Sequence, residues 1–322
     1  MISWKDCKFA DIHTDDFTHC FEPKSVAAIR AALGARRPLL VRGEPGVGKS
    51  QLAKAAAHAL QRPLVAHVVT ARTESRDLHY RFDAVARLAQ AQILATGPKK
   101  AEECLDLLDE KKYVQPGPLW WVFNWKTASD QQEATRIAGV RPQDPDPAWN
   151  WDQKTGGVVL LLDEIDKADP DVPNGLLESL GNRRFSVPYF QDPICCNPAA
   201  EPPLVVITTN EERELPAAFL RRCLVLHMAL PEGEEQLQDF LIGRGKAHFG
   251  ARLSHKVLAE AARQLARERG QEANDALVRP GQAEYLDLLN ALLEVAEATE
   301  ADQLRQLEVI KGFALIKNTP SS

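Results

Sequence analysis

The sequence predicts an α/β fold in which helices cover both sides of a parallel sheet, making three layers, followed by a smaller all-α domain. Before Pro231, short apolar runs alternate with helical segments, a pattern typical of a parallel sheet with helical connections. After Pro231, only helical patterns follow. The 322 residues suffice for one large domain and one small one, because domains usually hold about 100–200 residues.

The individual elements follow from the spacing of apolar residues. A helix is expected at 23–34, ending at Gly34. The expected strands are continuous apolar runs of the kind buried on both faces, at 38–41, 64–69, 158–162, 204–207 and 224–228. Apolar residues three and four apart predict helices at 232–249, 254–268, 283–298 and 301–316. We therefore place an α/β domain at 1–231 and a helical domain at 232–322.

One stretch, 96–156, reads as an irregular insertion. It contains Pro and Gly turns, an acidic segment at 144–147 and all but one of the six tryptophans. The aromatic residues at 120–125 are either core or a partner-binding surface, and such a cluster is more often core.

Composition excludes several classes of protein. The net charge is −6 with spread Arg and Lys, which argues against a dedicated nucleic-acid binder. The longest apolar run, 158–162, is far shorter than the ~20 residues that span a bilayer. No secretory signal is visible and the six cysteines form no CxxC pair. We expect no membrane segment, reduced thiols and a cytoplasmic location.

A phosphate-binding motif lies between the first predicted strand and the next helix. Its residues fit GxxxxGK[ST] and are Gly43, Glu44, Pro45, Gly46, Val47, Gly48, Lys49 and Ser50, with Gln51 following. Glycines let backbone N–H groups point at phosphate oxygens, at the positive end of a helix dipole. Lys49 is expected to reach the β and γ phosphates and Ser50 to bind Mg²⁺. The sequence therefore predicts ATP and Mg²⁺ as ligands.

Two further strands end in polar residues. Asp163 and Glu164 follow five apolar residues, and burying such charges is costly without a compensating cation or hydrogen bonds. We expect Asp163 to hold Mg²⁺ and Glu164 to polarise the attacking water. Asn210 ends the next strand and is a candidate sensor of the γ-phosphate.

A pair of arginines follows the sensor strand. Arg221 and Arg222 are either solvated surface charge or an arginine finger, and their position favours the finger. Within one subunit, no cation besides Lys49 is evident to neutralise the γ-phosphate. We therefore expect Arg222, with Arg221 as the alternative, to complete the site of a neighbouring subunit.

These motifs together resemble AAA+ ATPases, and within them the MoxR-type branch. The resemblance covers 23–316 and rests on GEPGVGKS, LLLDEIDKAD, VVITTNEERELPAAFLRRC and VRPGQAEYLDLL. It implies a helical lid at 232–322, with Arg279 as a second sensor near the start of a lid helix. It also implies a ring, commonly a hexamer, that remodels a protein client, often with a von Willebrand factor A-type partner.

Other features of the sequence agree with, or depart from, the MoxR-type pattern. The segment 117–119 resembles the GP(L/I) element of MoxR-type chains, and 184–203 resembles a hairpin ahead of the first sensor. DEID stands where DEIN is usual, Arg-Arg-Cys replaces Asp-Arg-Phe, and 120–157 is longer than expected. Two alternatives stay open: a GTP-using motor of a restriction-type system, and a slowly hydrolysing switch or scaffold in bacterial defence or signalling.

Overall fold

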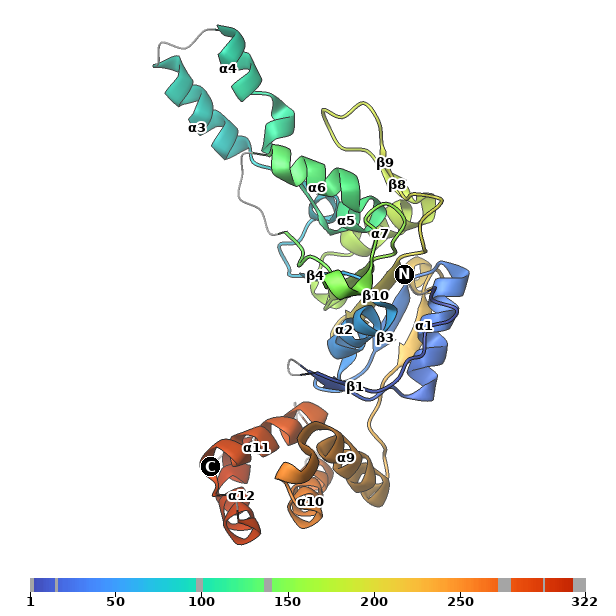
Figure 1. Ribbon diagram of the computed structural model, residues 1–322, viewed down its shortest axis with the longest axis vertical. Helices are drawn as coiled ribbons and strands as arrows, with labels where there is room; N and C mark the ends of the chain where they lie inside the picture. Colours follow the sequence, from blue (N-terminus) through green and yellow to red (C-terminus); the bar gives the residue numbers. More distant parts are fainter. Residues whose placement is uncertain are drawn as a thin grey trace. The chain divides into compact units, whose positions relative to one another are not determined.

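The computed structural model describes residues 3–14, 17–96, 101–135, 141–271, 279–297 and 299–314. The chain forms two compact units, seen in Figure 1. The first, which we call the sheet unit, comprises Met1–Phe9, Pro23–Val41 and Ala53–Leu226. The second, the lid unit, comprises Ala10–Glu22, Arg42–Leu52 and His227–Ser322. Among the described helices, none combines the length and apolar character needed to cross a membrane.

A five-stranded parallel sheet is the framework of the fold, as predicted. Its strands are β3 (Leu39–Arg42), β4 (Leu64–Val68), β7 (Val159–Asp163), β10 (Leu204–Thr209) and β11 (Leu224–His227), in the order β11-β3-β10-β7-β4. All six residues of β10 are buried, because helices and loops cover both faces of a central parallel strand. β7 pairs in parallel with both β10 and β4, which leaves β4 as the last strand.

The α/β part of the chain also contains helices. They are α1 (Pro23–Ala35), α2 (Lys49–Leu60), α3 (Ala84–Ala95), α4 (Ala101–Leu107), α5 (Pro118–Phe123), α6 (Trp125–Ala134), α7 (Asp171–Asn182) and α8 (Ala217–Leu220). Among these, α3 packs on α4 and on the turn Glu110–Tyr113. Short 3₁₀ turns are η1 (Ser75–Leu78), η2 (Glu110–Tyr113), η3 (Pro147–Trp149) and η4 (Ile165–Lys167). The predicted end of α1 at Gly34 is wrong by one residue. The helix continues through Ala35, and the left-handed residue that ends it is Arg36, with φ 52°.

The described residues also form three two-stranded antiparallel sheets. They pair β1 (Ile12–His13) with β2 (Thr18–His19), β5 (Tyr80–Phe82) with β6 (Val114–Pro116), and β8 (Arg184–Phe185) with β9 (Ile194–Cys195). The third lies in the stretch 184–203, where the resemblance implied a hairpin ahead of the sensor strand.

The aromatic segment 120–125 is helical core, which corrects the description of that part of 96–156 as irregular. Trp120 and Trp121 are each 1% exposed, and Trp125 is 4% exposed. Gly117 caps α5 and a proline occupies the first turn of that helix, a favoured arrangement at a helix start. The aromatic rings then pack against β4 and β7 in one apolar cluster. The core interpretation of the aromatic cluster is therefore confirmed.

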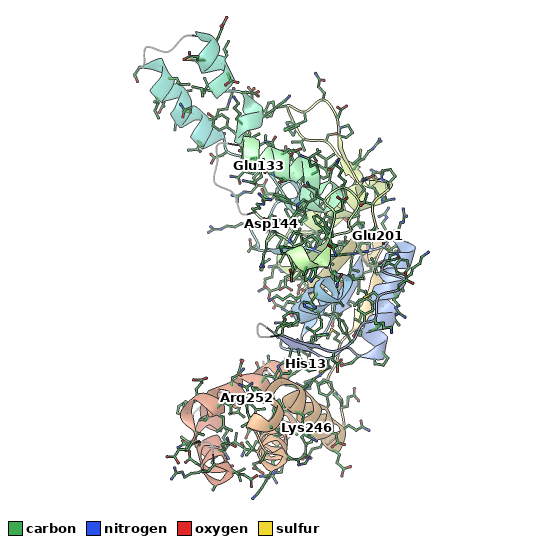
Figure 2. All side chains as sticks on the ribbon, in the orientation of Figure 1. His13, Glu133, Asp144, Glu201, Lys246 and Arg252 are labelled. Atoms are coloured by element: carbon green, nitrogen blue, oxygen red, sulfur yellow. The ribbon has the colours of Figure 1, made fainter. Side chains whose placement is uncertain are left out.

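A buried arginine connects the end of α2 to the segment that precedes β10. Arg62 is 1% exposed; its Nη1 donates to the carbonyl of Pro202 at 2.8 Å and its Nη2 pairs with Glu201 at 3.2 Å. Glu201 is labelled among the side chains in Figure 2. Because a buried charge is tolerated only with such partners, this contact ties the end of α2 to the entry of β10.

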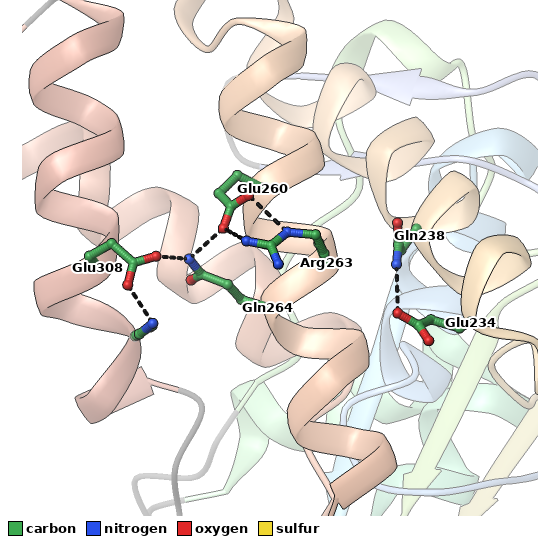
Figure 3. A network of polar contacts seen from close by, with 7 residues as sticks. Glu234, Gln238, Glu260, Arg263, Gln264 and Glu308 are labelled. Carbon is green, nitrogen blue, oxygen red and sulfur yellow. Dashed lines mark hydrogen bonds and ion pairs between the residues drawn. The ribbon is translucent and has the colours of Figure 1, made fainter.

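Four helices dominate the lid unit: α9 (Glu234–Phe249), α10 (His255–Gln271), α11 (Gln282–Val295) and α12 (Glu300–Ala314), with the turn η5 (Gly250–Arg252). Their leucines and Tyr285 form a second apolar core. Gln264 of α10 donates to Glu260 of the same helix and to Glu308 of α12 (Figure 3). This network fixes α12 against α10.

Candidate functional site

The glycine-rich loop joins β3 to α2 with a backbone that needs glycine. Gly43, Gly46 and Gly48 have φ of 152°, 78° and 93°, values that glycine adopts at low cost. A Cβ at Gly43 would lie 2.1 Å from the carbonyl oxygen of Met228. α2 begins at Lys49, so the positive end of its helix dipole lies next to the loop, as anion-binding sites require.

Lys49 turns its ammonium back into this loop. Its Nζ donates to the carbonyls of Gly43 and Glu44, both at 2.8 Å, and the residue is 7% exposed. Phosphate oxygens are charged acceptors and bind an ammonium more strongly than carbonyls do. The loop can therefore bind an anionic phosphate chain at Lys49. Ser50 stands beside Lys49 in the first turn of α2, followed by Gln51.

Two lid helices contact the loop within the lid unit. Arg269, at the end of α10, donates to Glu44 Oε2 at 2.5 Å and to the carbonyl of Pro280 at 3.2 Å. The N–H of Ala283, in the first turn of α11, donates to the carbonyl of Gly46 at 3.1 Å. The sequence analysis missed Arg269, because no motif marks it and 225 positions separate it from Glu44.

The predicted second sensor, Arg279, is exposed. The lid helix that follows, α11, begins at Gln282 with Gly281 as its N-cap, one residue before the predicted start at 283. The N-cap amide is bonded by the side chain of Glu284 at 2.9 Å, which fixes the start of the helix after the proline. Arg279 as a sensor stays a prediction, and Arg269 is the lid arginine that contacts the loop.

In the sheet unit, a threonine joins the ends of β7 and β10. The hydroxyl of Thr208 donates to Asp163 Oδ1 and accepts the N–H of Glu164 at 2.9 Å. Glu164 has φ 61°, a left-handed conformation that costs energy for a residue with a side chain. Strain of this kind gathers at functional sites. Thr208 holds both acidic residues in place and was not predicted.

The carboxylate of Glu164 has two polar neighbours. Asn210 Nδ2 donates to Oε1 at 3.4 Å, and Lys167 Nζ pairs with Oε2 at 2.6 Å. That hydrogen bond raises the pKa of Lys167. A cavity of about 320 Å³ lies beside them, lined also by Thr70 and Arg213. The structure thus brings the predicted base and sensor together, and the base, Glu164, lines a space for a reacting group.

Lys167 was not among the predicted site residues. It follows Glu164 by three residues and reaches it because η4 turns the chain directly after β7. The DEIDK segment carried this signal, since residues three apart meet in a helical turn.

The paired arginines lie at the end of α8, with both side chains exposed. Arg37 donates to their main-chain carbonyls, to that of Arg222 through Nε at 3.0 Å and to that of Arg221 through Nη2. Cys223, the next residue, is buried, and burial raises its pKa to about 11. The backbone is anchored while both guanidiniums are presented outward.

A family model for the AAA domain (dynein-related subfamily) matches residues 38–223. The chain belongs to this AAA family. The match contains the loop, both strand ends and the paired arginines. No match was found among curated proteins. A chain in the solved E. coli MS115-1 HORMA:CdnC:Trip13 complex is 17% identical, with a TM-score of 0.40, over 94% of this AAA protein and 80% of that chain.

Proposed function

We propose that this AAA protein is a Mg²⁺-dependent ATPase that works in a ring to remodel or activate a protein partner. The family implies nucleotide binding and, generally, hydrolysis. The observation that carries the proposal is the contact of Glu164 with Asn210 across the ends of β7 and β10. The loop of Lys49 continues β3, which neighbours β10 in the same sheet.

Each residue has a chemical task in this proposal. The loop amides and Lys49 bind the β and γ phosphates, and Asn210 orients the attacking water. Glu164 accepts the proton of that water as the oxygen attacks the γ-phosphorus. The strained backbone of Glu164 keeps its carboxylate at the strand end, toward the cavity.

The oxygen atoms of Ser50 and Asp163 also fit Mg²⁺. This ion prefers oxygen ligands and usually keeps several water molecules, so that the protein supplies only part of its coordination shell. The hydroxyl of Ser50 and the carboxylate of Asp163 would hold the ion, and Thr208 leaves Asp163 half-buried with its carboxylate oriented. When bound, the ion would neutralise part of the negative charge on the phosphates.

The assembly is proposed from the resemblance to MoxR-type chains. Arg222 of one subunit completes the site of its neighbour in a head-to-tail ring, commonly a hexamer in that branch. The client is a protein, with a von Willebrand factor A-type domain as the first candidate. Two observations support this arrangement: the side chain of Arg222 is exposed, and Arg37 holds its main-chain carbonyl. Mixing Arg222→Ala with Lys49→Ala should restore activity that neither variant has alone.

The central test compares two variants with the wild type. Lys49→Ala should lose ATP binding, because the loop loses its cation. Glu164→Gln should bind ATP and fail to hydrolyse it, because the amide cannot accept the proton. Equal turnover by Glu164→Gln and wild type would remove Glu164 from the mechanism.

A slowly hydrolysing switch or scaffold is the second candidate. It is favoured by the ion pair of Lys167 with Glu164, since that contact occupies one carboxylate oxygen of the proposed base. Turnover measured with and without a partner separates the two candidates. A switch would stay slow in both.

A further inference from the structure

A cavity of about 460 Å³ lies in the sheet unit, apart from the residues assigned to nucleotide chemistry. One wall is the edge strand β4, labelled in Figure 1. Its lining also includes Gln115 and Pro116 of β6. Its volume is within the range of about 300–1,000 Å³ that ligand sites occupy.

The hydrogen-bonding direction of β4 follows from its pairing. Pro63 accepts the N–H of Val159, and Val69 donates to Asp163, both across to β7. Backbone groups alternate sides along a strand, so residues 64, 66 and 68 point theirs away from β7. β4 is the last strand of the sheet in the described part of the chain. Its free edge therefore offers donors and acceptors to an added strand.

Two ring nitrogens beside the cavity lack partners. His67 Nε2 and Trp121 Nε1 are buried, and neither has a hydrogen bond within the described chain. Both residues line the cavity, and Trp121 is 1% exposed. A buried polar atom without a partner costs about 1–3 kcal/mol. Unpaired groups at a cavity that adjoins a free strand edge indicate a polar ligand.

The charged residues around the cavity favour a negatively charged ligand. Arg72 and Arg81 line it and are exposed, against one carboxylate, Asp77. No ion pair of either arginine is found among the described residues. Val68 adds an exposed apolar side chain, 58% exposed, on the same strand. The surface therefore combines cationic, apolar and backbone-bonding groups.

We propose that an extended acidic segment of a partner protein binds here as an additional strand along β4. Main-chain bonds to residues 66 and 68 provide affinity, and the two arginines choose acidic side chains. An isolated small anion would leave the strand edge unused, so a peptide uses more of the surface. The inference deepens the proposed action on a protein partner, but the binding itself requires no hydrolysis.

Fluorescence anisotropy tests this with a labelled, alternating Glu-Val peptide and no nucleotide. The wild type should bind it, and an alternating Lys-Val peptide should bind more weakly. A Glu-Val peptide with alternate amides N-methylated should lose about tenfold or more in affinity, since each lost hydrogen bond is worth about 0.5–1.5 kcal/mol. Lys49→Ala should bind like the wild type, which separates this site from the ATPase proposal.

Matched variants locate the site. Ala66→Pro removes an outward N–H without touching the ladder to β7, whereas Ala66→Val keeps it. Arg81→Glu reverses a lining charge, whereas Arg76→Glu reverses an exposed charge that pairs with Glu74. Only Ala66→Pro and Arg81→Glu should lose binding.

Circular dichroism checks that the Ala66→Pro variant folds, and Arg81→Glu tests the site independently of that strand change. The proposal is overturned if no Glu-Val peptide binds, if N-methylation has no effect, or if neither variant loses affinity. It is also overturned if sedimentation shows that the chain self-associates through this edge and Ala66→Pro abolishes the association, because the occupant is then a second copy.

Discussion

The ion pair between Arg269 and Glu44 should tune the nucleotide affinity of the loop. The two side chains are 16% and 48% exposed, with 2.5 Å between Nη2 and Oε2. Exposed pairs contribute about 0.2–1 kcal/mol and buried charged hydrogen bonds about 1.5–3 kcal/mol, so this half-buried pair should contribute about 1 kcal/mol. Arg269→Ala would leave a carboxylate unpaired in the loop that binds phosphates. We expect the Kd for ATP to rise about fivefold.

Calorimetric titration with a slowly hydrolysed ATP analogue measures the Kd of the wild type and of the Arg269→Ala variant. Glu44→Gln in the Arg269→Ala background should recover most of the affinity, because it removes the unpaired charge. Arg244 and Glu22 provide a matched control in the lid unit, 12% and 50% exposed at 2.7 Å. Arg244→Ala should lower stability similarly and leave the Kd unchanged. An unchanged Kd for Arg269→Ala, or a double variant as weak as the single one, would refute the reasoning.

Three further predictions concern the base, the core and the loop. Lys167→Met should raise turnover at saturating ATP, because Glu164 loses its competing cation. Lys167→Arg should stay near wild type. Equal turnover by the wild type and both variants would contradict this role of Lys167. Trp120→Ala should lower the free energy of unfolding in urea by about 3–5 kcal/mol, since the ring is buried; a loss below about 1 kcal/mol would contradict the core assignment. Gly43→Ala should abolish ATP binding, because its Cβ meets a carbonyl, while Gly181→Ala, with open space around its Cβ, should bind normally; comparable affinities would contradict that explanation.

The sheet could be predicted because its strands are uninterrupted apolar runs, and each lies within two residues of its predicted bounds. The meeting of Glu164 with Asn210 followed from the same pattern, since the carboxyl ends of neighbouring parallel strands share one edge. The part played by Thr208 was accessible in principle, because the register aligns Ile207 with Leu162 and so Thr208 with Asp163.

The other contacts depended on geometry that spacing does not encode. Arg269 reaches Glu44 through the folding of the lid unit, across 225 positions. Trp120 and Trp121 occupy core positions in a short helix, while Pro and Gly around them read as turns.

The loop that would hold the phosphates is also part of the lid core. Val47 is 5% exposed and packs in the same apolar cluster as Leu230, Leu237 and Tyr285. Met228 donates its N–H to the carbonyl of Arg42 at 2.8 Å, directly before the loop. Packed interiors repack between discrete arrangements and do not deform smoothly. A backbone shift at the loop on phosphate binding would therefore move lid residues directly, through shared packing, with no separate relay between nucleotide and lid.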